Sequence, residues 1–453
     1  MGTRIRALSW VVLSLAAIAP ALIALNFIYR FGVNVISWDE WEILPFFDDL
    51  YAGTLTLGRL FSQHNEHRIF FPRIIMLGVG HFTHYNTVSL MYVSWAFVFL
   101  ALVALFVVHR QLYGKSLAAL ALFIPTAWFV FTERQMENFL WGWQIQITGC
   151  TAMFICAVVL LRNAGRGWGR FVLAAACCVV SSFSFASGLL VWPAIFCELL
   201  YVLFQSKENL ARRVLLKMTV AWVALSLFCG ALYLHHYQKP GGHPSLEYAL
   251  RHPLLGLYVF TGTWGGALVR DVRPEVAAGA VLLALAAVLF VAATRGRVDP
   301  KRFVISIPLF VFAFGAIAMI TLGRSGFGVE GVCNASRYAT VSLLGVLGVY
   351  YGILALEAGA LRSTLAGAMG VIFALGIFGS LDGALEFGAG LRQHQRDVAR
   401  VLRTAEQRTA KELEIAYPRA GAVATRLKIM KKYRLNVCAD PGVACEAPQI
   451  PAE

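Results

Sequence analysis

Long runs of apolar residues recur along the whole chain, and short polar segments separate them. Most runs are close to the ~20 residues that an α-helix needs to cross the hydrocarbon core of a bilayer. The pattern predicts an all-α polytopic membrane protein with about eleven transmembrane helices and further interfacial helices on its outer face. The predicted spans are 8–29, 86–108, 116–131, 144–161, 171–186, 189–204, 216–235, 275–294, 303–321, 338–357 and 364–382.

Two apolar segments need a separate interpretation. The first run, 8–29, follows Arg4 and Arg6 as in a signal peptide, but it is longer than the usual apolar core of one, and we expect it to be a retained span. The segment 253–269 would reverse the topology of everything after it if it crossed the membrane. We therefore expect it to be interfacial or re-entrant.

The basic residues predict the orientation. The net charge is +14, and Lys and Arg are concentrated in short loops, which favours membrane topology over nucleic-acid binding as the reason for the charge. If all basic loops are cytoplasmic, the N-terminus is inside and the C-terminus is outside. The basic loops are 4–6, 109–115, 162–170, 207–217 and 295–302.

This orientation divides the chain into two parts. Residues 1–385 form a transmembrane module, and residues 386–453 form an outer tail that is too short for an independent domain with a large core. Acids, histidines and tryptophans gather in the predicted outer loops, so we expect any catalytic chemistry at the outer face. The outer loops are 30–85, 132–144, 236–274 and 323–338.

The cysteines do not suggest a metal site. Six of the nine lie in apolar runs, where cysteine behaves as a small hydrophobic residue. Cys438 and Cys445 lie in the predicted outer tail, in an oxidising compartment, where a disulfide between them is plausible. Cys333 also faces the outside and could compete for the pairing.

The first outer loop contains an unusual density of acids, histidines and tryptophans. We predict a short helix over 39–52, closed by Gly53 and apolar enough on one side to lie on the membrane. A partly desolvated carboxylate near the interface has a raised pKa and can act as a general base, and Asp39 and Glu40 are the candidates. The alternative is a solvated loop whose acids favour a helix N-terminus.

Further along the same loop, His64, Glu66, His67 and Arg68 are candidates for substrate binding. On a helix, the spacing of the two histidines would let both meet one metal ion or one phosphate. Two histidines alone do not define a metal site, so we predict none, although a divalent cation would be compatible with the loop. We favour binding of an anion by His67 and Arg68.

The fourth outer loop carries two arginines, Arg324 and Arg337, at its ends. Outer-face arginines run against the usual charge bias, and arginine binds phosphate in a bidentate manner, so a phosphate site is one interpretation. The alternatives are snorkelling of Arg337 and pairing of both arginines with outer-loop acids such as Glu330. Tyr338 follows Arg337 directly.

In the second outer loop, Glu137, Asn138 and Trp141 are typical of a carbohydrate-binding surface, because aromatic faces stack on sugar rings and amides bond to hydroxyls. Trp143 belongs to the same stretch. The alternative is an aromatic belt at the membrane boundary.

The acidic pair Asp39-Glu40 directly after the first span, in a polytopic chain, resembles the GT-C superfamily of membrane glycosyltransferases. The resemblance implies a polyprenyl-phosphate-linked sugar as donor, a periplasmic acceptor (glycan, lipid or protein) and a site on the outer face. The segments 64–68 and 336–338 also resemble uncharacterised bacterial membrane proteins associated with cell-envelope sugars, which implies the bacterial inner membrane. The short tail departs from many family members, which have a large soluble C-terminal domain.

The implied chemistry needs a base for the acceptor hydroxyl and positive charge on the departing phosphate. Asp39 or Glu40 would supply the base, and Arg68, Arg324 or Arg337 the charge. The alternatives are a transporter or flippase for a lipid-linked sugar, and another lipid-linked-glycan enzyme such as a ligase or polymerase. A transporter is disfavoured because the predicted spans contain few ionisable residues, Glu198 among them.

Overall fold

The computed structural model describes residues 2–162, 167–242, 244, 246–443 and 445. In this part of the chain the regular elements are helices, and extended pairing is limited to two isolated β-bridges. Nine helical segments among the described residues are long and apolar enough to cross a membrane, and Trp168–Ser182 and Ala360–Ala374 are shorter apolar helices. The protein is therefore a polytopic α-helical membrane protein, as predicted.

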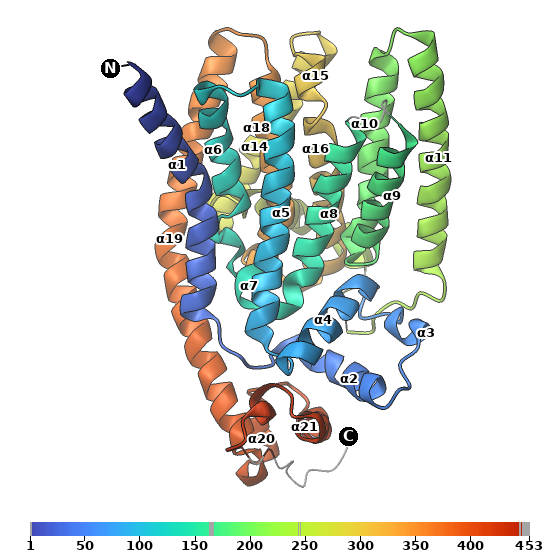
Figure 1. Ribbon diagram of the computed structural model, residues 1–453, viewed down its shortest axis with the longest axis vertical. Coiled ribbons are helices and arrows are strands. Elements are labelled where there is room, and N and C mark those ends of the chain that lie inside the picture. The colour runs from blue at the N-terminus through green and yellow to red at the C-terminus, as the bar shows by residue number, and fades with distance from the viewer. Residues whose placement is uncertain (1, 163–166, 243, 245, 444, 446–453) are drawn as a thin grey trace.

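The long helices form an upright bundle (Figure 1). α18 lies inside it and is buried along its whole length, whereas α19 continues far past the end of the bundle. The bundle helices are α1 (Gly2–Phe31), α5 (Thr87–Tyr113), α6 (Leu117–Val130), α8 (Ile145–Leu161), α9 (Trp168–Ser182), α10 (Val191–Gln205), α11 (Asn209–Leu234), α14 (Val272–Thr294), α16 (Ser306–Arg324), α18 (Ala339–Ala355) and α19 (Ala360–Arg403).

The two ends of the bundle are formed by different segments of the chain. In Figure 1 the N-terminus and α15 (Pro300–Phe303) lie at the upper end, together with the connections between α5 and α6 and between α10 and α11. The first outer loop and the tail lie together at the lower end. Their helices are α2 (Leu44–Tyr51), α3 (Leu57–Leu60), α4 (Phe70–Thr83), α20 (Ala410–Leu413) and α21 (Ala420–Tyr433).

The segment expected to be interfacial or re-entrant contains α13 (Pro253–Gly265), which is too short to cross a bilayer. It packs along α16, with Phe260 5.3 Å from Phe314 and Trp264 5.2 Å from Phe310 between ring centroids. Five residues after α13 ends, Arg270 donates to the carbonyl of Gly383 in α19. The segment therefore packs against α16 and contacts α19 without forming a helix long enough to cross a bilayer.

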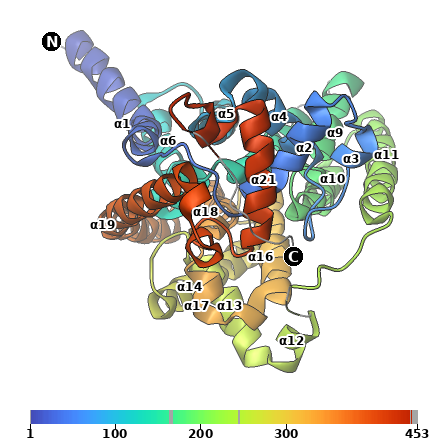
Figure 2. The same ribbon diagram turned by 90° about the horizontal axis from the view of Figure 1, so that it is seen from below.

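The tail shares a hydrophobic core with the first outer loop. Trp41 and Phe47 from the loop are packed in one cluster with Leu402 and Leu427 from the tail. The indole of Trp41 also donates to the carbonyl of Ala416 at 3.2 Å. The disulfide expected from the sequence, Cys438–Cys445, is present and belongs to this cluster. Figure 2, seen from the lower end, shows α21 lying across α2.

Candidate functional site

The acidic start of the first outer loop forms helix where the sequence predicts it. A 3-10 helix, Trp38–Ile43, leads directly into α2, and Gly53 follows with a positive φ of 72°. Ser37 and Glu40 form a capping box, in which the Glu40 carboxylate accepts from the amide of Ser37 at 2.8 Å. The two adjacent candidates for the base, Asp39 and Glu40, are thereby held on one turn.

Glu40 points into the protein and is only 1% exposed. Burial raises the pKa of Glu40 to about 8, although the amides of Ser37, Trp143 and Gly142 oppose the shift. The hydroxyl of Tyr85 donates to the backbone carbonyl of Glu40 at 3.2 Å. Glu40 thus carries a proton at neutral pH and has no surface for a substrate.

Asp39 points the other way, and its side chain is 39% exposed. Its Oδ2 atom lies 3.8 Å from Nε2 of His64, and the His64 ring packs edge-on against Trp143 with 5.0 Å between centroids. Trp143 itself is buried and cannot stack on a sugar. Asp39 is therefore the accessible carboxylate of the pair, with an imidazole beside it.

The segment from His64 to His67 is a tight turn and not a helix. The two residues exchange backbone hydrogen bonds of 2.8 Å in both directions, and Asn65 between them has a φ of 49°. His67 accepts from the amide of Ala186 through Nδ1 at 3.1 Å. Burial lowers the pKa of His67 to about 4, so the ring is neutral and its Nε2 carries the hydrogen.

Glu66 joins this turn to the fourth outer loop. Its Oε1 atom lies 3.5 Å from Nε2 of His67, and the same oxygen accepts a hydrogen bond from the guanidinium of Arg324 at the end of α16. Both members of the Glu66–Arg324 ion pair remain partly exposed. The adjacent residues Glu66 and His67 therefore form one row of polar side chains with Arg324, which lies 258 positions further along the chain.

The second arginine of the fourth loop is paired in a similar way. Arg337 Nη1 lies 3.0 Å from Oε1 of Glu137, and the Arg337 amide donates to Oε2 at 2.8 Å. Ser336 donates to the same carboxylate at 3.0 Å. Both arginines thus pair with outer-loop acids, which is the alternative that the sequence left open, with Glu66 and Glu137 in place of Glu330.

Three of the expected substrate contacts, His67, Asn138 and Tyr338, are buried in the structure. Asn138 is fully buried and donates to the carbonyl of Arg337 and to the hydroxyl of Thr340. Tyr338 is buried beneath the guanidinium of Arg337. Trp141 is partly exposed and donates to the carbonyl of Ser37 at 3.3 Å. Asn138 therefore joins the second loop to the fourth, whereas Tyr338 packs in a cluster with Val259, Ile320 and Val332.

Arg68, expected at the phosphate, is also buried. Its guanidinium donates to the carbonyls of Phe61, Tyr233 and His235 and so ties the first loop to the end of α11. Arg73, which the sequence analysis did not single out, is buried as well and donates to the carbonyl of Leu60 at 2.8 Å. A sequence does not distinguish such arginines from ligand-binding ones, because their acceptors are backbone carbonyls.

The segment 132–144 is not the open loop that the sequence predicts. Arg134 and the adjacent residues Glu133 and Gln135 are buried. The Arg134 guanidinium lies 3.3 Å from Oε1 of Glu275 in α14, and the Glu275 side chain is fully buried. Arg134 also donates twice to the carbonyl of Gly266, directly after α13 ends. The bundle thus contains a buried ion pair that the sequence analysis, which considered ionisable residues only within the predicted spans, did not identify.

Among the residues that the structure describes, no group of three or more His, Cys, Asp or Glu side chains is arranged to hold a metal ion. Comparisons with protein-family models, with curated proteins and with solved structures found no match. The function must therefore be inferred from the fold and from the arrangement of these side chains.

Proposed function

We propose that the protein is a glycosyltransferase that moves a sugar from a polyprenyl-phosphate carrier to an acceptor at the outer face of the bacterial inner membrane. The single observation that carries the proposal is the exposed carboxylate of Asp39 beside His64, at the end of the bundle where the outer loops meet. Eleven crossings, with the lower end of Figure 1 facing the periplasm, are part of the proposal.

Asp39 acts as the general base for the acceptor hydroxyl. It is accessible, whereas the adjacent Glu40 is buried and protonated, so only Asp39 can take a proton from a bound substrate. His64 positions the carboxylate and can take part in proton transfer. The buried side chains of Glu40 and Trp143 pack beside this turn and hold it rigid.

Arg324 and Arg337 supply positive charge for the departing phosphate. Each is partly exposed and paired with one carboxylate, Glu66 or Glu137. A lipid-linked phosphate would compete with that carboxylate for the guanidinium, and bidentate binding would favour the phosphate. Arg68, Asn138 and Tyr338 have scaffold roles in this scheme.

The test is sugar transfer by the full-length protein in proteoliposomes with a panel of polyprenyl-phosphate sugars. Loss of a catalytic base typically costs about 10²–10⁴-fold in rate, so Asp39→Asn should nearly abolish transfer. Asp49→Asn is the matched control, because Asp49 lies in the same loop and pairs with Arg59 on the surface. Wild-type transfer by Asp39→Asn would exclude this residue as the base.

A transporter of a lipid-linked sugar is the second candidate, and the buried Arg134–Glu275 pair at the end of α13 favours it. Ionisable pairs and broken helices inside a bundle mark the substrate path in many transporters. Flipping of a fluorescent polyprenyl-phosphate sugar across vesicles, lost in Glu275→Gln and retained in Asp39→Asn, would support transport. The opposite pattern in the transfer assay would support the enzyme.

A further inference from the structure

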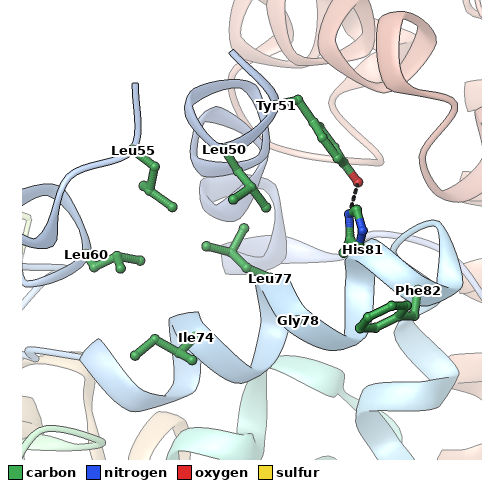
Figure 3. A pocket seen from close by; sticks show the side chains of 9 residues that line it. All are labelled: Leu50, Tyr51, Leu55, Leu60, Ile74, Leu77, Gly78, His81 and Phe82. Carbon is green, nitrogen blue, oxygen red and sulfur yellow. Dashed lines mark hydrogen bonds between the residues drawn. The ribbon is translucent and has the colours of Figure 1, made fainter. Parts of the chain in front are cut away.

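An open apolar groove lies in the first outer loop, away from the acidic and basic side chains of the candidate site. It has a volume of about 450 Å³ and runs between α2, the segment 55–60 and α4 (Figure 3). Its walls are aliphatic, with polar atoms at one end, where the Tyr51 hydroxyl is 3.3 Å from Nδ1 of His81. The aliphatic side chains are Leu50, Leu55, Leu60, Ile74 and Leu77.

The position of α4 places this groove at the membrane boundary. At the start of α4, the Phe71 amide donates to the carbonyl of Phe183, directly after α9 ends. At its other end, α4 finishes at Thr83 and α5 begins at Thr87. α4 therefore links α9 to α5 at the lower end of the bundle, which under the proposed topology is where these helices leave the bilayer.

The exposed face of α4 is apolar. Ile74 is 43% exposed and Phe82 is 85% exposed, with Gly78 between them on the same face of the helix. A helix with this pattern at the end of a bundle is typical of one that lies in the interface, with its apolar face in the acyl region. The bilayer is therefore the apolar phase with which the groove is continuous.

We propose that this groove binds a hydrocarbon chain of a bilayer lipid, with the lipid head group at the end formed by Tyr51 and His81. The lining is apolar except at the end formed by Tyr51 and His81, so a hydrocarbon chain satisfies it and a polar ligand does not. A chain that enters from the outer leaflet travels along the exposed side of α4 and never crosses water. The inference holds whether or not the protein is an enzyme.

Gly78 provides a way to close the groove without disturbing the fold. A β-carbon at Gly78 would have no other atom within 4 Å, and a larger residue in a helix interior improves helix propensity. Gly78→Leu should therefore fill the space that the chain occupies. Gly230→Leu is the matched control, because Gly230 lies inside α11 and its β-carbon also meets no atom within 4 Å. Leu55→Trp closes the groove from the opposite wall and serves as a second variant.

The experiment is photolabelling of the full-length protein in vesicles of phosphatidylethanolamine and phosphatidylglycerol that contain a phosphatidylcholine with a diazirine in one acyl chain. Adducts are mapped by mass spectrometry. We expect label on Leu77, which is only 5% exposed, in the wild type and in Gly230→Leu. Gly78→Leu and Leu55→Trp should lose that label several-fold, while Phe82 is labelled equally in all four proteins.

Label on Phe82 without label on Leu77 in the wild type would overturn the proposal, because the bilayer would then touch only the rim of the groove. Label on Leu77 that survives in both groove-filling variants would overturn it as well. A protein partner or a second copy in the groove would give the first of these results, since it would exclude lipid from Leu77. None of these readouts depends on sugar transfer, so the test is independent of the proposed function.

Discussion

The carboxylate of Glu40 lies directly against Gly142, and a β-carbon at position 142 would be 2.9 Å from its Oε1 atom. The same β-carbon would be 2.9 Å from Cβ of Leu90 and 3.0 Å from the carbonyl oxygen of Thr87. A glycine is thus required where the 3-10 turn Gly142–Gln144, just before α8, passes the acidic turn and α5. This contact connects the first outer loop to the bundle.

Gly142→Ala should therefore destabilise the protein. Overpacking of a filled interior typically costs about 1–3 kcal/mol. Here two of the three atoms nearest to the added β-carbon, Cβ of Leu90 and the carbonyl oxygen of Thr87, belong to α5. The measurement is thermal unfolding of the purified protein in detergent. Gly230→Ala, at a position with free space around it, is the control and should unfold at or slightly above the wild-type temperature. Equal unfolding temperatures for the two variants would contradict the packing described here.

Glu40 should make stability depend on pH. The unfolded carboxyl titrates near 4.5 and the folded one at about 8, so between these values the folded state holds a proton that the unfolded state releases. Stability is therefore fully present below the lower value and falls as the pH rises, by up to about tenfold in the folding equilibrium constant per pH unit.

Glu40→Gln keeps the shape of the side chain and cannot ionise. Its unfolding temperature should equal that of the wild type near pH 4.5 and exceed it increasingly as the pH rises. Above about pH 8 the difference between the two unfolding temperatures should stay constant. The comparison of the two proteins at each pH cancels the contribution of other groups. A constant difference between them across the whole range would show that Glu40 is ionised in the folded protein.

The ion pair between Glu42 and Arg426 should hold the tail on the first loop. Arg426 Nη2 lies 2.8 Å from Oε1 of Glu42, and the Tyr417 hydroxyl donates to the same oxygen at 2.9 Å. A double-mutant cycle with alanine should give a coupling energy of about 1 kcal/mol, read from the rate of chymotrypsin cleavage in the tail.

The pair Asp48–Lys432 is the control for that cycle. Both of its side chains are well exposed, so solvent screens their attraction and the coupling should be weaker than that of the Glu42–Arg426 pair. If the exposed pair proves the stronger of the two, the partly buried Glu42–Arg426 pair does not hold the tail in place.

The topology can be tested with two single substitutions at exposed lysines. Lys115→Cys lies in the connection between α5 and α6, and Lys428→Cys lies in α21 at the opposite end of the molecule. In intact cells, a membrane-impermeant maleimide should label Lys428→Cys at once and Lys115→Cys only after the membrane is permeabilised. The reverse order would invert the protein in the membrane and place Asp39 in the cytoplasm.

The membrane class and the position of most long helices follow from the sequence alone. Apolar runs of membrane length must form helices because a bilayer offers the backbone no other hydrogen-bond partner. Even the short helix after Ser37 could be predicted, because its capping residues and Gly53 act on their own neighbours. These features depend on interactions between residues that are close together in the chain.

Only the tertiary structure decided which polar residues remain accessible. Asp39 and Glu40 are adjacent and similar, yet one is exposed and the other is buried against Gly142, which lies about a hundred positions away in the chain. Likewise, Arg324 pairs with Glu66 and Arg68 donates to Tyr233, and in both cases the partner is more than 150 positions away in the chain. Burial and pairing of this kind depend on how distant helices pack, and each contact involves a residue that no local pattern identifies.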